Sequence, residues 1–284
     1  MVALDIENLK RWAGRSEAAA DSVTPVPVAA LRATLDLDQG APRAGEPLPL
    51  PWQWLYFLPI HRQSALSENG HPRLGDFIPP VPLPRRMYAG GRMYMHQPLR
   101  IGDAIQRIST IADVSYKQGS SGPLVFLQIR HEISNQQGLA ITETQDIVYR
   151  EESRPGIAAP AAQAAPATQQ WLREFQADPI LLFRFSALTF NGHRIHYDYP
   201  YVTGVEGYPG LVVHGPLLAV LLLDLLQRQL PASQVREFSF RALHPVFNMA
   251  PFYLCGGLAG QQSASLWVRD ADGVLCLSAT AELA

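Results

Sequence analysis

The stretch Pro216–Gln229 reads PLLAVLLLDLLQRQ and is nearly all apolar until its last turn. A helix that is apolar on so many faces must be buried on most of them. The segment Leu124–Val148 contains two alternating strands around an Asn-Gln-Gln-Gly turn, and Ala264–Leu283 contains two more around Asp-Ala-Asp-Gly. Both patterns indicate a β-hairpin with a glycine at the turn. One long buried helix among antiparallel strands predicts an α+β fold in which a sheet wraps around a central helix.

This pattern occurs once in each half of the chain, which indicates a duplicated fold. Upstream of each hairpin, a strand ends in a proline: Met93–Pro98 in the first half and Phe238–Pro245 in the second. A shorter and weaker helix around Pro27–Leu37 is the counterpart of Pro216–Gln229. The repeat lies in the order of the elements more than in their residues.

A composition break separates the two halves. The segment Pro155–Thr168 reads PGIAAPAAQAAPAT and has no charge, no aromatic residue and no hydrophobic period. Its prolines prevent a continuous helix, and such a tract is typical of a semi-rigid spacer. A loop within one domain is the alternative, but structureless loops of this length are uncommon inside a compact fold. We therefore predict an N-terminal half at residues 1–154, a linker at 155–168 and a C-terminal half at 169–284.

Length and composition exclude several classes of protein. The 284 residues are 47% hydrophobic and 17% charged, with a formal charge of −2, so the chain can form a core and has no basic excess for binding nucleic acid. The longest apolar run, Pro216–Leu223, is too short to span a bilayer, and the N-terminus lacks the pattern of a secretory signal. Cys255 and Cys276 cannot form a disulfide framework or a four-cysteine zinc site. We expect a soluble, cytoplasmic enzyme or ligand-binding module.

Three of the eight histidines, His193, His196 and His214, lie close together in the sequence. The sequence His214-Gly215-Pro216 opens the apolar helix. Backbone N–H groups at a helix start have no intrahelical partner and lie at the positive end of the helix dipole. They can stabilise a developing oxyanion if a carbonyl is presented there. The alternative is a structural histidine that caps the helix.

A metal site at His193 and His196, with Asp198 as a third ligand, competes with this interpretation. The segment lacks the His-Glu-x-x-His pattern, and Ile195–Tyr199 looks like a chain leaving its helix, so we expect no metal. Structural roles are expected for the other five histidines, which are His61, His71, His96, His131 and His244.

The block Ala177–Pro245 resembles the MaoC-like hydratases of the hot-dog fold. Their motif is Gly-Asp-x-Asn-Pro-x-His, followed after a variable loop by a His-Gly that starts the central helix. Here Thr189–His196 reads TFNGHRIH, and Val213–Pro216 reads VHGP. The resemblance implies a double hot-dog fold, with two antiparallel sheets that each wrap around a central helix.

The family's functional residues fall on specific positions of this chain. The resemblance places the catalytic aspartate at Asn191, the second asparagine at His193 and the catalytic histidine at His196. It places the oxyanion-hole backbone amide at Gly215. This chain departs from the family at Asn191, where an asparagine replaces the catalytic aspartate. An amide cannot act as a base, so the substitution removes one of the two acid–base groups. His196 must then do most of the acid–base chemistry, and Asn191 would hold the water or the histidine by hydrogen bonds.

The N-terminal half resembles the dehydratase-type partner domain of the same superfamily. Together the halves resemble the double hot-dog hydratases that act on itaconyl-CoA or mesaconyl-C4-CoA, and more distantly the mitochondrial-type 3-hydroxyacyl-thioester dehydratases. The resemblance also implies a homodimer. The matching segments are Trp52–Pro59, Gly70-His71-Pro72, Pro79–Gly91 and Pro98–Asp103.

The implied reaction is hydro-lyase chemistry, in which water adds across the double bond of an enoyl-CoA thioester to give citramalyl-CoA. His196 would activate the water, the Gly215 N–H would bind the thioester oxygen, and no cofactor beyond the CoA of the substrate is expected. Two alternatives remain, a hot-dog thioesterase and a non-catalytic acyl-thioester-binding module. The replacement of the catalytic aspartate by Asn191 favours the binding module.

A dicarboxylyl thioester also carries a free carboxylate, which needs a cation. Arg85 and Arg86 precede a Gly-Gly kink where a backbone can approach a ligand, although a solvated surface pair is an equal alternative. We assign these two arginines, together with His193, His214 and Arg241, to substrate binding. Arg92 and Arg194 are further candidates.

Overall fold

The computed structural model describes residues 4–119, 122–151 and 162–284. Its strands are β1 (Ser16–Ser22), β2 (Arg85–Met95), β3 (Ala104–Gly119), β4 (Gly122–Asn135), β5 (Gly138–Arg150), β6 (Trp171–Phe175), β7 (Val235–Ala242), β8 (Phe252–Leu258), β9 (Ser263–Arg269) and β10 (Leu275–Leu283). Its α-helices are α1 (Ile6–Lys10), α2 (Pro25–Thr34), α3 (Pro179–Leu188), α4 (Tyr199–Gly204) and α5 (Gly215–Gln229). Three 3₁₀ turns complete the fold: η1 (Trp52–Leu55), η2 (Gln63–Ala65) and η3 (Arg194–His196).

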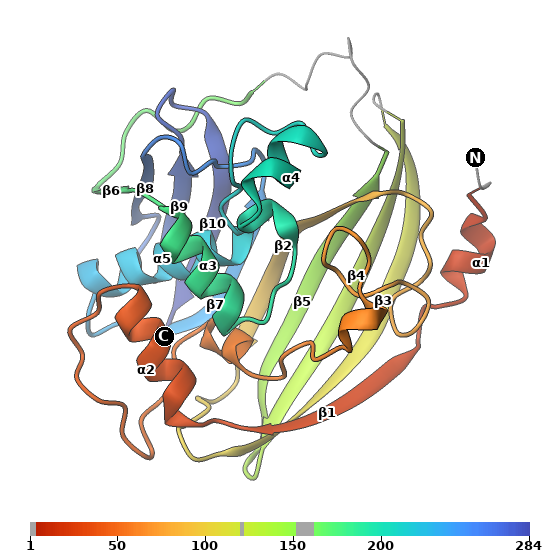
Figure 1. The fold of residues 1–284 in the computed structure, drawn as a ribbon. Coiled ribbons are helices and arrows are strands. Elements are labelled where there is room, and N and C mark those ends of the chain that lie inside the picture. The colour runs from red at the N-terminus through yellow and green to blue at the C-terminus, as the bar shows by residue number, and fades with distance from the viewer. Residues whose placement is uncertain (1–3, 120–121, 152–161) are drawn as a thin grey trace.

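The strands form one antiparallel sheet in the order β1-β3-β4-β5-β2-β7-β10-β9-β8-β6 (Figure 1). Strands β1 to β5 precede the predicted linker, and strands β6 to β10 follow it. Numbered within its own half, each set of five strands has the same order: first, third, fourth, fifth, second. The α+β class predicted from the sequence is confirmed, and the shared strand order is that of a duplicated fold.

The halves meet where β2, the second strand of the N-terminal half, pairs with β7, the second strand of the C-terminal half. Gly90 lies opposite Arg241, and Tyr94 lies opposite Glu237. Pairing satisfies the backbone N–H and C=O groups that each strand would otherwise expose at a sheet edge. The two sheets expected from the resemblance are therefore continuous with each other.

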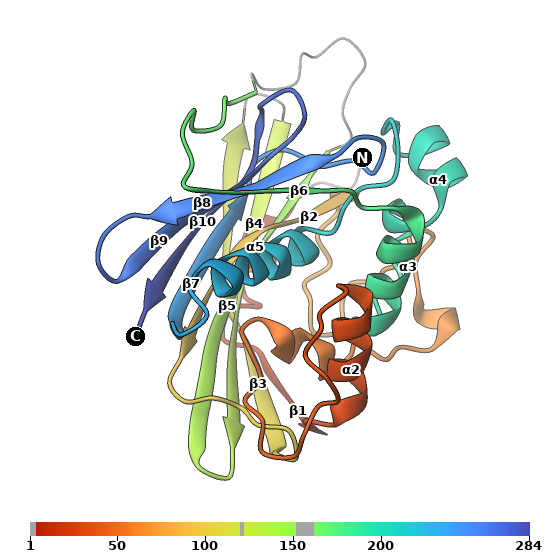
Figure 2. The same ribbon diagram turned by 90° about the vertical axis from the view of Figure 1, so that its left-hand side faces the viewer.

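Helix α5 is the buried central helix predicted from Pro216–Gln229, and it begins one residue earlier, at Gly215. It contacts β6, β8, β9 and β10 (Figure 2). Its apolar side chains pack with residues from the inner face of these strands, such as Leu254 and Leu266. The buried positions of the helix are Leu217, Leu218, Ala219, Val220, Leu221, Leu222, Leu223, Leu225 and Leu226.

The structure differs from the expectation in the helix of the N-terminal half. Helix α2 forms near the predicted position but packs mainly against α3 and η1. Its Val28 and Leu31 are buried, whereas Val26 is 73% exposed. A helix with only one apolar face can cover the edge of a core but cannot fill its centre.

Part of the predicted linker, residues 155–161, lies outside the described residues. The part that follows is attached to the turn between β9 and β10: Gln163 O accepts a hydrogen bond from Leu275 N, and Ala165 N donates one to Gly273 O. The predicted boundaries of the two halves stay a prediction. In the ranges that the structure describes, no helix is long and apolar enough to cross a membrane.

The junction between β2 and β7 requires a glycine. A Cβ atom at Gly90 would lie 2.3 Å from the backbone oxygen of Phe240. We expect Gly90→Ala to lower the free energy of unfolding by about 2–3 kcal/mol, because the clash is with a backbone that other contacts hold in place. Gly204→Ala is the matched control, since an added Cβ there would meet nothing within 4 Å. Urea unfolding of both variants tests this; equal stability would contradict it.

Candidate active site

An open cleft of about 1570 Å³ runs between the inner face of the N-terminal half and the start of α5. Six of the eight predicted site residues line it, from both halves of the chain. His214 lies behind His196 and is only 1% exposed. The six residues are Arg85, Arg86, Asn191, His193, His196 and Gly215.

The loop that carries Asn191 leaves α3 through a hydrogen-bonded cap. The N–H of Asn191 donates to Ser186 O at 2.8 Å, and the N–H of Phe190 donates to Ala187 O at 3.3 Å. These two bonds form the Schellman cap, whose left-handed position is usually a glycine. Phe190 occupies that position with φ 50°. The side-chain oxygen of Asn191 accepts a hydrogen bond from the N–H of His193, at 3.0 Å, so the Asn191 side chain holds the loop in shape.

His196 is fixed to the segment that precedes α5 by two hydrogen bonds. Its Nδ1 lies 2.7 Å from Val212 O, and the N–H of Val212 donates to Ile195 O at 3.0 Å. A carbonyl oxygen only accepts, so Nδ1 carries the proton and Nε2 keeps a free lone pair. Burial lowers the pKa of His196 to about 4, although the bond to Val212 opposes the shift. His196 is therefore an uncharged base at neutral pH.

Four histidine rings lie in a row along this wall of the cleft. The ring centroids are 4.2 Å apart for His71 and His193, 5.6 Å for His193 and His196, and 3.6 Å for His196 and His214. His214 Nε2 lies 2.8 Å from the Ser186 hydroxyl oxygen. Burial, reinforced by neighbouring histidines, lowers the pKa of His193 to about 3 and those of His71 and His214 well below the usual range. The low dielectric of the row thus keeps all four rings uncharged at neutral pH.

His71 was expected to be structural, but the structure places it in the cleft. It belongs to a tight loop in which the side-chain oxygen of Asn69 accepts a hydrogen bond from the N–H of His71, at 3.0 Å. Gly70 has φ +89°, and a Cβ atom there would lie 1.8 Å from the Gly192 backbone oxygen. Only a glycine allows the two loops to approach so closely. The sequence signal for this contact was the Gly70-His71-Pro72 motif, but nothing local indicated its partner.

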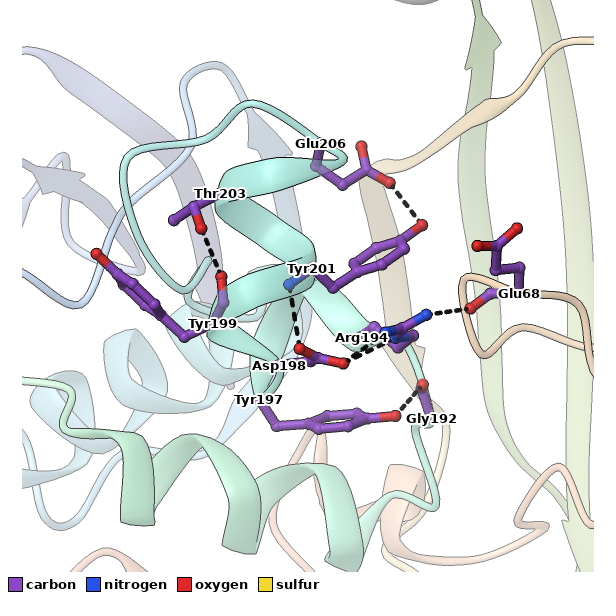
Figure 3. A network of polar contacts seen from close by, with 9 residues as sticks. All are labelled: Glu68, Gly192, Arg194, Tyr197, Asp198, Tyr199, Tyr201, Thr203 and Glu206. Atoms are coloured by element: carbon purple, nitrogen blue, oxygen red, sulfur yellow. Dashed lines mark hydrogen bonds and ion pairs between the residues drawn. The ribbon is translucent and has the colours of Figure 1, made fainter.

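Arg194 joins the two loops that meet at the cleft (Figure 3). Its guanidinium forms an ion pair with Asp198, with a shortest distance of 2.8 Å, and donates to Glu68 O at 3.2 Å. Its backbone N–H donates to Asn69 O at 3.0 Å. The hydrogen bond from Arg194 lowers the pKa of the Asp198 carboxyl. Arg194 is therefore engaged in holding the N-terminal loop against the histidine-bearing loop.

The start of α5 faces the cleft with an unobstructed backbone. Within the part of the chain that the structure describes, the N–H of Gly215 has no hydrogen-bond acceptor. An added Cβ at Gly215 would meet nothing within 4 Å, so a ligand atom can approach here. This N–H and the positive end of the helix dipole form a site for a developing negative charge on oxygen.

The three arginines that we assigned to substrate binding have different environments. Arg85 donates to Glu206 O at 2.8 Å and lies over the Tyr208 ring, so it is tied to the wall of the cleft. Arg86 has no carboxylate partner among the described residues, and its charge contributes to the lowered pKa values of His71 and His193. Arg86 is therefore a cation close to the histidine row.

Arg241 lies outside the cleft, contrary to its assignment as a substrate contact. It follows Phe240, whose ring faces the core, so the alternation of the strand turns Arg241 to the exposed outer face of the sheet. The sequence pattern did not indicate which residues of this strand face inward.

The prediction that the site holds no metal stays a prediction. One group of three potential ligands occurs in the described ranges, formed by His244, Asp270 and Cys276, whose ligand atoms lie within 4.8 Å of one another. Burial raises the pKa of the Cys276 thiol to about 12, so it is protonated at neutral pH.

Comparisons with known proteins agree with this geometry. Over residues 51–248, the chain matches the protein family described as hydroxyacyl-thioester dehydratase type 2. The mesaconyl-C(4)-CoA hydratase of Chloroflexus aurantiacus is 48% identical over 272 residues, which cover 96% of each protein. The mitochondrial hydroxyacyl-thioester dehydratase type 2 of Schizosaccharomyces pombe is 28% identical over 76% of this chain and 79% of its own. A solved MaoC-like dehydratase from Phytophthora capsici has a TM-score of 0.68 at 14% identity and covers 99% of both chains. This structural likeness confirms the double hot-dog fold.

The histidine row predicts how stability changes with pH. Between about pH 7 and pH 5, the unfolded chain protonates histidines with a pKa near 6.5, whereas folded His193 and His196 have pKa values of about 3 and about 4. The unfolded state then binds more protons, so the free energy of unfolding falls as the pH falls. Each such histidine contributes a slope of up to about 1.4 kcal/mol per pH unit. We expect His193→Gln to reduce the slope by about this amount in urea unfolding. An unchanged slope would mean that His193 takes up its proton over the same pH range in the folded and unfolded states.

Proposed function

The chain belongs to the hydroxyacyl-thioester dehydratase type 2 family, and from this premise we propose that it hydrates an α,β-unsaturated acyl-CoA as a hydro-lyase. The observation that carries the proposal is the placement of His196, with a free Nε2, in the same cleft as the free N–H of Gly215. A hydratase needs this combination of a base for water and a donor for the thioester oxygen.

The substrate that the relatives favour is mesaconyl-C4-CoA, because the relative with 48% identity over 96% of the chain is a mesaconyl-C(4)-CoA hydratase. Itaconyl-CoA is the second substrate that the sequence indicated. In either case the hydrated product would be citramalyl-CoA, and the CoA would be part of the substrate rather than a resident cofactor.

The reaction begins when the thioester carbonyl accepts a hydrogen bond from the N–H of Gly215. His196 Nε2 removes a proton from water, and the water oxygen forms a bond to the β-carbon. The electrons of the double bond move to the carbonyl oxygen, where the helix start stabilises the enolate-like charge. The proton then passes from the His196 imidazolium to the α-carbon, so that one water molecule has been added and His196 is uncharged again.

The low pKa of His196 suits the second of these proton transfers. A group with a pKa of about 4 is a modest base, but its protonated form is a strong acid. The imidazolium that forms during the reaction would therefore give its proton readily to carbon. The buried neighbours of His196 keep this acid strong, because a positive charge in the row is poorly solvated.

Asn191 has a positioning role in this scheme. Its side-chain oxygen already accepts the N–H of His193, and an amide does not titrate. The aspartate of the family is thus replaced by a residue that shapes the loop, and the acid–base work is left to His196.

Arg86 is the residue that we propose for the free carboxylate of the substrate. In mesaconyl-C4-CoA this carboxylate is bonded to the β-carbon, so it must lie near the water-activating histidine. Arg86 lines the same cleft, near His71 and His193. Arginine binds a carboxylate with two parallel hydrogen bonds, which would also fix the orientation of the double bond.

We further propose a homodimer, which the sequence resemblance supports, and a cytoplasmic location; neither changes the chemistry. Light scattering of the purified protein tests the first, and fractionation of cells tests the second.

Substitution of His196 tests the assignment of the base. We expect His196→Gln to lower kcat for mesaconyl-C4-CoA about a hundredfold or more, because the amide cannot take a proton from water. The assay follows the loss of enoyl-thioester absorbance and identifies the product by mass. His96→Gln, at an exposed position outside the cleft, should keep the wild-type rate. Release of free thiol by the wild type would instead indicate a thioesterase, and tight binding without turnover would indicate a binding module.

Substitution of Arg86 tests the assignment of the carboxylate contact. We expect Arg86→Met to lower kcat/KM for mesaconyl-C4-CoA by about tenfold to a hundredfold relative to crotonyl-CoA, which has no carboxylate. Arg92→Met is the matched control, because Arg92 lies on the same strand but forms its ion pair with Glu237 outside the cleft. An equal loss for both substrates would place the carboxylate elsewhere.

A further inference from the structure

The inner face of the N-terminal half carries a row of polar side chains across four strands. Glu17 of β1 lies opposite Ser109 of β3, Ser109 lies opposite His131 of β4, and His131 lies opposite Glu143 of β5. Side chains directly opposite each other on neighbouring antiparallel strands share one face of a sheet. Ser109, His131 and Glu143 are only 1%, 7% and 2% exposed. We refer to these four residues as the polar row.

The polar row lies between two apolar regions of the inner face. On one side, Ile105, Ile133 and Ile141 belong to the main core. On the other side, the same strands contribute Ile111, Ile129 and Ile147 to a second hydrophobic cluster. Polar groups in such a position require hydrogen-bond partners, and an apolar residue would need none. Stability alone therefore does not account for the row.

The buried members of the row are held by hydrogen bonds. Glu143 accepts from Gln53 Nε2 at 3.1 Å, from Trp54 Nε1 at 2.8 Å and from Gln145 Nε2 at 2.8 Å. His131 Nδ1 lies 2.9 Å from the Ser109 hydroxyl oxygen. These contacts fix the side chains, so the row is a rigid part of the floor rather than a set of mobile groups.

Two further polar groups beside the row have unused hydrogen-bonding atoms. Arg107 lies over the Phe57 ring, and its Nε is buried without a partner among the described residues. The hydroxyl of Tyr88 is likewise buried and without a partner in the described ranges. Burial, together with the charge of Glu143, raises the pKa of Tyr88 well above its usual range, so this hydroxyl keeps its proton.

This polar floor is part of the same cleft as the histidine row. The cleft is lined by Glu17, Tyr88, Arg107, His131 and Gln145 as well as by His196 and Gly215. In the C-terminal half, α5 packs against the strands and fills the space over the inner face. In the N-terminal half, the middle of the inner face lines the cleft instead. A substrate anchored at Gly215 can therefore extend over this floor.

The acyl group, rather than the CoA, suits this part of the cleft. Carboxylates of the row, at Glu17 and Glu143, would repel the phosphates of CoA. The guanidinium of Arg107 is shared electrostatically by Glu17 and Glu143, so it is already partly neutralised. A short acyl group does not reach Glu17, Glu143 and Arg107, whereas a long one must lie against them.

We propose that the polar row sets the acyl specificity of the enzyme by admitting short or polar acyl groups and rejecting long aliphatic ones. The inference rests on the proposed hydration of enoyl-CoA. An alkyl chain lying across this floor would remove water from the partly exposed polar groups that line the cleft there, Glu17, Arg107 and Gln145, without offering hydrogen bonds. Such groups discriminate strongly against apolar ligands. The row thus selects substrates by the length and polarity of the acyl group, whereas the reaction at His196 does not depend on acyl length.

The first test compares crotonyl-CoA with trans-2-decenoyl-CoA as substrates of the wild-type protein. We expect kcat/KM for crotonyl-CoA to be about a hundredfold higher or more, because the decenoyl chain is long enough to cover several groups of the row. Equal values for the two substrates would overturn the proposal.

The second test removes polarity from the row and from Gln145, which lies beside it and donates to Glu143. Gln145→Met keeps the volume of the side chain, and Ser109→Ala with His131→Leu removes both partners of one hydrogen bond, so that neither is left unsatisfied. We expect the ratio of decenoyl to crotonyl turnover to rise about tenfold or more in each variant. The control is Ser239→Ala with Thr280→Val, which removes a hydrogen bond of 2.7 Å on the exposed outer face of the sheet. It should leave the ratio at the wild-type value.

The outcomes separate this inference from the proposed function. If the wild type hydrates neither substrate, the proposed function fails, and the row is tested by calorimetry with the saturated esters butyryl-CoA and decanoyl-CoA. The proposed role of the row would still be supported if the wild type bound decanoyl-CoA more weakly than butyryl-CoA, and if Gln145→Met bound decanoyl-CoA more tightly than the wild type does. Melting temperatures show whether each variant folds. An unchanged ratio in both variants, Gln145→Met and Ser109→Ala with His131→Leu, when both are folded, would overturn the inference whatever the absolute rate.

Discussion

The burial of α5 is the constraint on which the rest of the structure depends. A helix with Leu or Val on almost every face cannot lie on a surface, so strands must cover it on several sides. The strands of the C-terminal half do this, and they leave one end of the helix uncovered, at Gly215. That end carries the N–H of Gly215, which has no acceptor among the described residues, and the positive end of the dipole. A buried apolar helix therefore also provides a site for negative charge. Hydrogen bonds join His196 and Ile195 to Val212, so the base is tied to the segment that leads into the oxyanion site.

Desolvation is the second organising effect. Four imidazole rings packed together with little water lose the ability to hold a positive charge, and this lowers stability in acid. The same loss gives the protein a base whose conjugate acid is strong. A solvated histidine would accept a proton from water more readily but would return it to carbon less readily. The buried position of His196 thus makes proton removal from water less favourable and proton donation to the α-carbon more favourable.

The sequence predicted the elements whose causes are local. The helix at Pro216–Gln229 followed from its composition, and the hairpins followed from alternation and turn residues. Two other features could not be predicted, because their causes lie in distant parts of the chain. The contact of Gly70 with Gly192 depends on how the two halves meet, and the pairing of β2 with β7 places Arg241 on the outer face. Phe190 is a third case: a left-handed φ at a phenylalanine contradicts local preference, and only the cap that orients Asn191 accounts for it.

The two halves have the same strand order but different contents, and this difference explains how one fold can bind and react at once. In the C-terminal half, leucines of α5 fill the inner face, which makes that half a rigid support for the catalytic groups. In the N-terminal half, α2 stays beside α3, so the inner face remains open and its side chains meet the substrate. A substitution on the open inner face of the N-terminal half changes which acyl groups bind, and it leaves the packing of the C-terminal half around His196 unchanged. Specificity can therefore vary within such a fold through residues such as His131 and Gln145, at positions that carry no part of the chemistry.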